Sequence, residues 1–203
     1  MLKKLLVGSV LLSASLASQA GIISVIDGAD MAGIEVTASF ADGSQELVTW
    51  SATDATSGSV VGSDWSLSLS GETFGDYDGS TNTLFGEWVL VNNTASGLTN
   101  LLINAGLVDV YFDIEESIEY TAGSEAGRPF VSSDDVGTTA SFTDVYSAPD
   151  LFGTLNIAWD SSLAAGSSYS FLTDTDKAVV SEPATALVFL TGLLALVNYR
   201  RKS

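Results

Sequence analysis

The sequence predicts an all-β protein, an antiparallel β-sandwich with one apolar helical segment at each end of the chain. Three observations support this prediction. Apolar and polar residues alternate with period two in the middle of the chain, glycine-containing turn signals separate the alternating segments, and long apolar runs occur only near the termini. The 203 residues are therefore expected to form one β-domain between two terminal segments.

The first 20 residues have the three parts of a secretory signal peptide. Lys3-Lys4 is a charged start, Leu5–Leu16 is apolar, and Ser18-Gln19-Ala20 provides the small residues that precede a cleavage site. We expect cleavage between Ala20 and Gly21, so that the chain is exported and its domain begins at residue 21.

Residues 21–176 are predicted to form strands. Trp65–Ser70 alternates apolar residues with serine, and Val108–Ile114 places its apolar residues on one face and Asp109 and Asp113 on the other. Further candidate strands, separated by turns such as Asp42-Gly43 and Ser96-Gly97, are Ile34–Phe40, Glu46–Ser51, Phe85–Asn92, Leu98–Asn104, Ser141–Tyr146, Phe152–Trp159 and Tyr169–Thr173. About nine or ten short strands at this spacing predict an Ig-like or jelly-roll-like sandwich.

Residues 182–203 have the composition of a membrane-anchoring tail. The apolar run Ala184–Tyr199 would be roughly 24 Å long as a helix, which is short for a bilayer core of about 30 Å. The basic residues Arg200, Arg201 and Lys202 follow it, and the positive-inside rule places them in the cytoplasm. We expect a transmembrane helix at 184–199, a basic tail at 200–203 and a linker at 177–181.

A short motif, Ser181-Glu182-Pro183-Ala184-Thr185, begins this tail. Together with the apolar run and the basic residues that follow it, this motif resembles the PEP-CTERM sorting signal of Gram-negative bacteria. Glu182 and Pro183 match the motif of that family, and Ser181 stands where the common motif has its first proline. The resemblance identifies the tail, not the domain before it.

The resemblance implies that the chain is a substrate of an exosortase, a membrane-embedded cysteine transpeptidase. This enzyme would recognise Glu182-Pro183 and cut near the motif. The resemblance further implies a chain tethered to the inner membrane and facing the periplasm, which then reaches the cell surface or the exopolysaccharide matrix of a biofilm.

The composition of residues 21–181 excludes several classes of function. This part holds 24 acidic residues and only two cations, Arg128 and Lys177, so its net charge is −22. Such a surface repels phosphate backbones, and we expect no nucleic-acid partner. The chain has no cysteine and no histidine, which removes disulfides, histidine-assisted nucleophiles and the usual zinc ligands. We therefore expect no enzyme activity.

Acidic segments supply the candidate ion sites. Asp76 and Asp78, with Asn82 after the intervening glycine, alternate oxygen ligands around a turn as calcium loops do, and a plain polar hairpin turn is the alternative. Asp174-Thr175-Asp176 is a weaker candidate, although several acidic segments can share one ion in a fold. Calcium is the only cofactor that the sequence suggests.

Two further groups of residues bear on function. Asp113, Glu115, Glu116 and Glu119 lie close enough in sequence to suggest glycoside hydrolysis, but we expect them to form a solvated strand face. Trp65 has the parity of Leu67 and Leu69 and is expected in the core, whereas an exposed tryptophan could stack on sugars.

These observations predict a structural or adhesive protein of the cell surface or extracellular matrix. A carbohydrate-binding module of the matrix is the first alternative, and a secreted carboxylate-dependent glycosidase is a less favoured one.

Overall fold

The computed structural model of the chain describes residues 20–23, 26–78, 83–116, 121, 124–132 and 137–180. The predicted apolar core of the signal peptide and the predicted tail lie outside the described residues. The tail includes the motif Ser181-Glu182-Pro183-Ala184 and the basic residues Arg200, Arg201 and Lys202. The chain divides into two compact units, and the one that spans Ile22–Ala178 contains the β-domain.

The described residues form two main antiparallel sheets and a small hairpin, which confirms the all-β prediction. The first sheet contains β1 (Ala20–Ile23), β2 (Glu35–Phe40), β3 (Gln45–Thr49), β10 (Leu98–Asn104), β11 (Val110–Asp113), β13 (Thr138–Ser147), β14 (Leu151–Leu163) and β16 (Asp174–Val180). The second contains β4 (Ser51–Ala52), β5 (Ser57–Val61), β6 (Trp65–Ser70), β9 (Trp88–Asn92), β12 (Val131–Ser132) and β15 (Ser167–Leu172). The hairpin pairs β7 (Asp76–Asp78) with β8 (Thr83–Phe85), and a 3-10 turn, η1 (Gly106–Val108), precedes β11.

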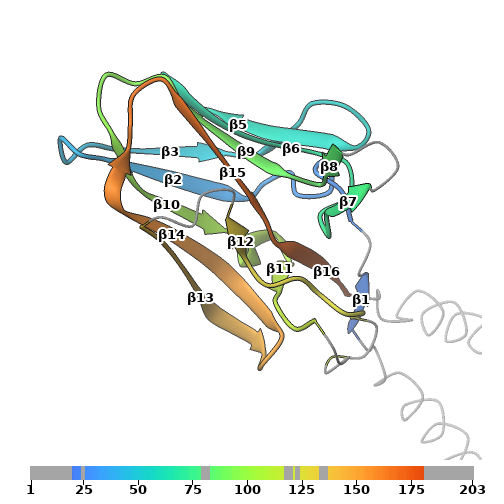
Figure 1. Cartoon of the computed structure of the whole chain (residues 1–203). Helices are drawn as coiled ribbons and strands as arrows, with labels where there is room; N and C mark the ends of the chain where they lie inside the picture. Colours follow the sequence, from blue (N-terminus) through green and yellow to red (C-terminus); the bar gives the residue numbers. More distant parts are fainter. Residues whose placement is uncertain are drawn as a thin grey trace, which may run out of the picture. The chain divides into compact units, whose positions relative to one another are not determined.

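The chain crosses repeatedly between the two sheets. The first sheet has the order β1-β16-β11-β14-β10-β2-β3, with β13 paired to β14, and the second has the order β12-β15-β9-β6-β5-β4. Figure 1 shows β10, β13 and β14 together in one layer and β5, β6 and β9 together in another. Because β11 pairs with both β14 and β16, the first sheet joins segments that are far apart in sequence.

The core lies between the two sheets because the alternating strands turn their apolar residues toward each other. Val36 and Ala38 of β2 and Leu67 of β6 are completely buried and belong to one hydrophobic cluster. The Trp88 ring of the second sheet lies 6.4 Å from the Phe112 ring of the first. Burial of each large side chain stabilises the fold by roughly 1.5–3 kcal/mol. This shared core is consistent with the predicted β-sandwich.

Two predicted strands match the structure, and another is divided. Trp65–Ser70 and Leu98–Asn104 have the predicted bounds as β6 and β10. The predicted strand Phe85–Asn92 is interrupted at Gly86, whose φ is +68° and where a Cβ would lie 2.2 Å from the Glu72 carbonyl oxygen. This backbone conformation and close approach require glycine, so β8 ends before it and β9 starts after it.

The predicted linker also differs from the structure. Residues 177–180 continue β16, in which Lys177 pairs with Val110 of β11. The Lys177 ammonium group donates a hydrogen bond to the Asp30 carbonyl oxygen at 2.8 Å. Regular strand structure therefore continues up to Val180, directly before the predicted sorting motif.

Within the described part of the chain, no helix is long and apolar enough to cross a membrane. The predicted transmembrane segment at 184–199 lies outside that part.

A candidate metal centre

Three buried aspartates meet where β11 pairs with β16. Asp113 lies directly opposite Asp174 in the antiparallel ladder, and Asp176 follows two residues later on the same strand face. Their exposed fractions are 1%, 2% and 0%. Each offers a carboxylate oxygen, and these three atoms lie within 4.8 Å of one another. The strand pairing thus concentrates three carboxyl groups inside the protein.

A fourth aspartate, Asp150, lies just before β14 and is 1% exposed. Its Oδ1 accepts a hydrogen bond from the Leu151 amide at 3.1 Å, and its carbonyl oxygen accepts one from the Ile114 amide at 3.1 Å. The Asp150 charge acts on both Asp113 and Asp176. We call Asp113, Asp150, Asp174 and Asp176 the aspartate cluster.

Two hydroxyl groups contact the aspartate cluster. The Ser124 Oγ lies 2.7 Å from Asp113 Oδ2 and 2.6 Å from Asp176 Oδ2, and the Thr73 hydroxyl donates to Asp174 Oδ1 at 3.1 Å. A serine hydroxyl carries one hydrogen, so Ser124 can donate to only one of its two carboxylate neighbours at a time. The other short contact requires a proton or a cation between two negatively polarised oxygens.

Two oxygens of the aspartate cluster have no hydrogen-bond partner among the described residues. They are Asp150 Oδ2 and Asp176 Oδ1, and both are buried. An unpaired buried polar atom costs about 1–3 kcal/mol, and more when it is charged. The local structure therefore leaves lone pairs that the described side chains and backbone do not satisfy.

The environment of the aspartate cluster disfavours negative charge. Burial, together with the neighbouring Asp176 charge, raises the pKa of Asp174 to about 8. Burial likewise raises the pKa of Asp176 to about 7, with contributions from the Asp113 and Asp150 charges. The pKa of Asp113 is also raised by burial. At neutral pH the cluster must therefore hold protons or a cation.

The segment around Gly127 covers Asp113. The Gly127 amide donates to the Glu115 carbonyl oxygen, the Arg128 amide donates to the Asp113 carbonyl oxygen, and the Asp174 amide donates to the Arg128 carbonyl oxygen. A Cβ on Gly127 would lie 2.3 Å from the Asp113 carboxylate carbon, so glycine permits this close packing. A pocket of about 250 Å³, lined in part by Gly127 and Glu116, opens beside this segment.

The structure corrects the sequence interpretation of Asp113. The alternation of Val108–Ile114 predicted that Asp113 faces solvent, but it is buried against Ser124 and the Gly127 segment. Its neighbour Glu116 is exposed, as expected for a solvated strand end, and Glu119 lies outside the described residues. Alternation reports which residues share a face, and it does not report that a distant segment covers that face.

The residues of the predicted calcium turn are only partly described. Asp76 and Asp78 lie in β7, opposite Phe85 and Thr83 of β8, and Asn82 lies outside the described residues. The β7–β8 pairing is the arrangement expected of the plain polar hairpin turn, and the turn residues 79–82 lie outside the described residues. Ala20 and Gly21, the predicted signal-cleavage pair, both lie in β1.

The sequence makes Asp174-Thr175-Asp176 a weaker ion candidate than the Asp76–Asn82 turn, but the structure buries both of its aspartates beside Asp113. The ladder supplies Asp113, and the turn before β14 supplies Asp150. The only sequence signal was the spacing of two aspartates by one residue near the end of the domain.

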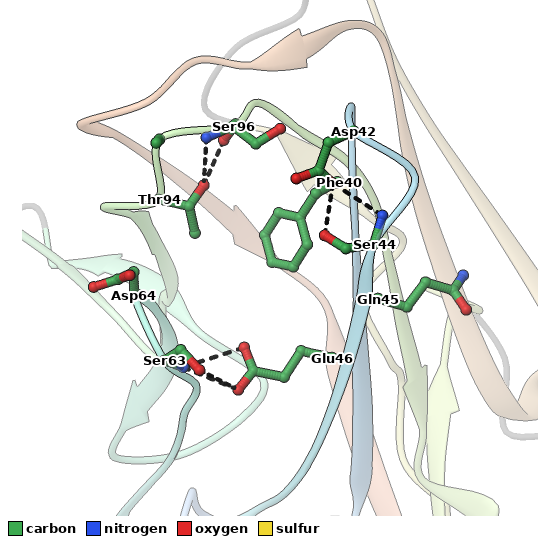
Figure 2. A pocket seen from close by; sticks show the side chains of 10 residues that line it. Phe40, Asp42, Ser44, Gln45, Glu46, Ser63, Asp64, Thr94 and Ser96 are labelled. Carbon is green, nitrogen blue, oxygen red and sulfur yellow. Dashed lines mark hydrogen bonds between the residues drawn. The ribbon is translucent and has the colours of Figure 1, made fainter.

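A second pocket lies on the surface of the protein. Unlike the buried aspartate cluster, it is open to solvent and lined mainly by polar residues. This pocket of about 640 Å³ is lined by Phe40 and by polar side chains of the β2–β3 turn and of two loops. In Figure 2, the Glu46 carboxylate accepts hydrogen bonds from Ser63, and Asp42 accepts them from Ser44. Glu46 Oε2 also accepts a hydrogen bond from the Trp65 indole at 2.7 Å.

The tryptophans do not line this pocket. Trp50, Trp65 and Trp88 are at most 2% exposed, which confirms the core position predicted for Trp65. Trp159 is partly buried against the core and contacts Tyr169 edge-on.

The chain matches no protein-family model, and comparisons with curated proteins and with solved structures find no match either. The fold and the aspartate cluster are therefore interpreted from their own geometry.

Proposed function

We propose that this protein is an exported structural or adhesive component of the surface or extracellular matrix of a Gram-negative bacterium, sorted through its C-terminal tail. The observation that carries the proposal is the order of parts along the chain. A segment with the pattern of an export signal comes first, a strongly acidic β-domain follows, and a motif, an apolar run and three cations come last. The domain is the cargo, and the two ends direct it.

The properties of the domain support a structural role. Its core is continuous between two sheets and contains no cysteine, so the fold depends on packing and not on disulfides. An Ig-like or jelly-roll-like sandwich suits this role because its rigid body requires no cofactor chemistry. The net charge of residues 21–181 keeps an exported chain soluble and attracts cations.

The position of β16 supports sorting by the tail. β16 ends at Val180, and the motif begins at Ser181. A peptidase that acts near Glu182-Pro183 would therefore cut directly beyond a folded strand, and its product would be a complete domain. The proposed partners are an exosortase-type transpeptidase, the inner membrane and the exopolysaccharide.

Expression of the full chain in a Gram-negative host with and without an exosortase tests this proposal. We expect an N-terminus at Gly21 in both hosts, a membrane-associated chain without the exosortase, and loss of the apolar tail with it. Mass spectrometry of the recovered protein measures both ends. A Glu182→Ala variant should retain the tail, and a matched Glu116→Ala variant should not. A cytosolic protein with both termini intact would contradict the proposal.

Carbohydrate binding is a second candidate because of the pocket in Figure 2. Hydroxyl and carboxylate groups of Ser44, Ser63 and Glu46 line this pocket, and such groups bind sugar hydroxyls. Isothermal titration with the polysaccharide of the source organism should then give heat that a Glu46→Ala variant lacks. No heat with either protein would remove this candidate. Hydrolysis by the aspartate cluster is disfavoured because its carboxylates are too buried to contact a glycoside.

A further inference from the structure

We infer that Asp113, Asp174 and Asp176, supported by Asp150, bind one calcium ion inside the domain. This inference goes beyond the proposed function, since it concerns the stability of the fold and holds whether or not the chain is exported. It rests on geometry, on unpaired oxygens and on the chemistry of the available ligands.

The geometry fits one ion of calcium size. Calcium binds oxygens at about 2.3–2.6 Å, so two ligands on opposite sides of the ion are at most about 5 Å apart. The ligand oxygens of Asp113, Asp174 and Asp176 lie within 4.8 Å of one another. Small movements of these side chains would bring all three oxygens to calcium-binding distance, and the strand pairing that positions them would be kept.

The unpaired oxygens point to a missing positive partner. Asp176 Oδ1 is completely buried and has no hydrogen-bond partner among the described residues, and Asp150 Oδ2 is in the same condition. Asp150 lies outside the group of three, yet its charge acts on Asp113 and Asp176. Buried carboxylates without partners are rare unless they bind a cation or a proton.

The ligand types select the ion. Zinc and most transition metals prefer histidine and cysteine, and the chain has neither. Magnesium keeps several waters and is rarely enclosed by protein ligands alone, whereas calcium accepts six to eight oxygens in flexible arrangements. The aspartate cluster and the Ser124 hydroxyl form an enclosed all-oxygen site, which favours calcium.

The ion would connect two neighbouring strands of the first sheet. Asp113 belongs to β11, and Asp174 and Asp176 belong to β16. Bound calcium would therefore join the last strand of the domain to the centre of the first sheet. Its removal would leave bound protons as the remaining compensation for the buried carboxylates.

Thermal unfolding and isothermal titration of the full chain in mild detergent test the inference. The protein is treated with a chelator, dialysed and titrated with calcium chloride at constant ionic strength. We expect one strongly bound ion per chain and a melting temperature higher by roughly 5–10 °C when calcium exceeds its Kd about 100-fold. An equal response to magnesium at the same concentration would contradict the choice of calcium.

Variants separate the buried site from the acidic surface. Asp176→Asn should abolish the strong binding and the rise in melting temperature, and it should leave the metal-free protein equally or more stable because one buried charge is removed. Asp64→Asn, which removes an exposed carboxylate, should keep both responses. If Asp176→Asn does not fold, Asp174→Asn should weaken binding at least tenfold. No rise in wild type, or equal rises in all variants, would overturn the inference.

Discussion

At the scale of single residues, the buried tryptophans Trp50 and Trp88 differ in the hydrogen bonding of the indole N–H. The Trp50 indole N–H donates a hydrogen bond to the Gly28 carbonyl oxygen at 2.8 Å, whereas the Trp88 indole nitrogen has no partner among the described residues. Both rings are buried and lie 5.4 Å apart. The two rings are therefore comparably buried neighbours that differ in the hydrogen bonding of the indole N–H.

We predict that Trp50→Phe destabilises the domain more than Trp88→Phe. Both changes remove similar volume from the core, but only the first leaves a buried carbonyl oxygen unpaired, which costs about 1–3 kcal/mol. Urea denaturation of the two variants measures the difference. Equal losses of the free energy of unfolding would show that the Gly28 contact contributes nothing.

The pKa values of the aspartate cluster predict a pH dependence for the metal-free protein. Asp174 and Asp176 have folded-state pKa values of about 8 and about 7, whereas an unfolded aspartate has a pKa of about 3.9. Between these limits the folded state holds protons that the unfolded state has released. The stability contributed by this proton uptake is therefore full below about pH 4 and is lost as pH rises through about 8.

Chemical denaturation in chelator at about pH 5.5 and about pH 8.5 measures this loss. Wild type should lose on the order of a few kcal/mol more than an Asp174→Asn/Asp176→Asn double variant, which cannot titrate at these positions. The charges that face the pair belong to Asp113, Asp150 and Glu125, and they remain in the variant. An identical pH slope for the two proteins would contradict the assignment.

At the scale of elements, the entry into β11 depends on one left-handed residue. Asp109 has φ +59° where η1 ends, and its amide donates to the Gly106 carbonyl oxygen. Its side chain is exposed. Residues other than glycine are strained in this conformation, although aspartate tolerates it better than most.

We expect Asp109→Gly to raise the free energy of unfolding by up to about 1 kcal/mol, because glycine adopts this conformation without strain. The matched variant Asp64→Gly lies at an exposed position without positive φ and should be destabilising. Thermal unfolding of both compares them directly. A larger loss for Asp109→Gly than for Asp64→Gly would show that the aspartate side chain stabilises this turn.

Elements were predictable where the alternation was strong and local. Trp65–Ser70 and Leu98–Asn104 were identified with the observed bounds because their alternating or continuous apolar residues identify strands without further context. β5 was missed because Ser57, Gly58 and Ser59 offer no apolar alternation. β16 was missed because its aspartates resemble a polar loop, and only their burial in the folded domain explains them.

The aspartate cluster was beyond sequence reasoning for a related reason. Asp113 pairs with Asp174 only because β11 lies between β14 and β16. Local sequence patterns do not predict this strand order. The Gly127 segment that covers Asp113 has no regular structure to predict. The sequence supplied the acidic residues, and the topology decided which of them meet.

At the scale of the whole molecule, the acidic charge opposes compaction. Residues 21–181 carry a net charge of −22, and like charges repel more strongly in the folded state than in the expanded one. We predict that the melting temperature of the chelator-treated protein rises between about 10 mM and about 150 mM sodium chloride, since the screening length shortens from about 30 Å to about 8 Å. Differential scanning calorimetry measures the rise, and sucrose serves as an uncharged control. A fall in melting temperature with salt would show that attractive pairs dominate instead.

The aspartate cluster draws on residues from Asp113 to Asp176, so it cannot assemble until nearly the entire domain has emerged from the ribosome or translocation pore. Until then each carboxylate remains hydrated and the first sheet lacks its closing strand. A polypeptide threaded N-terminus first would thus stay extended during passage and acquire its final rigidity only when the last strand arrives.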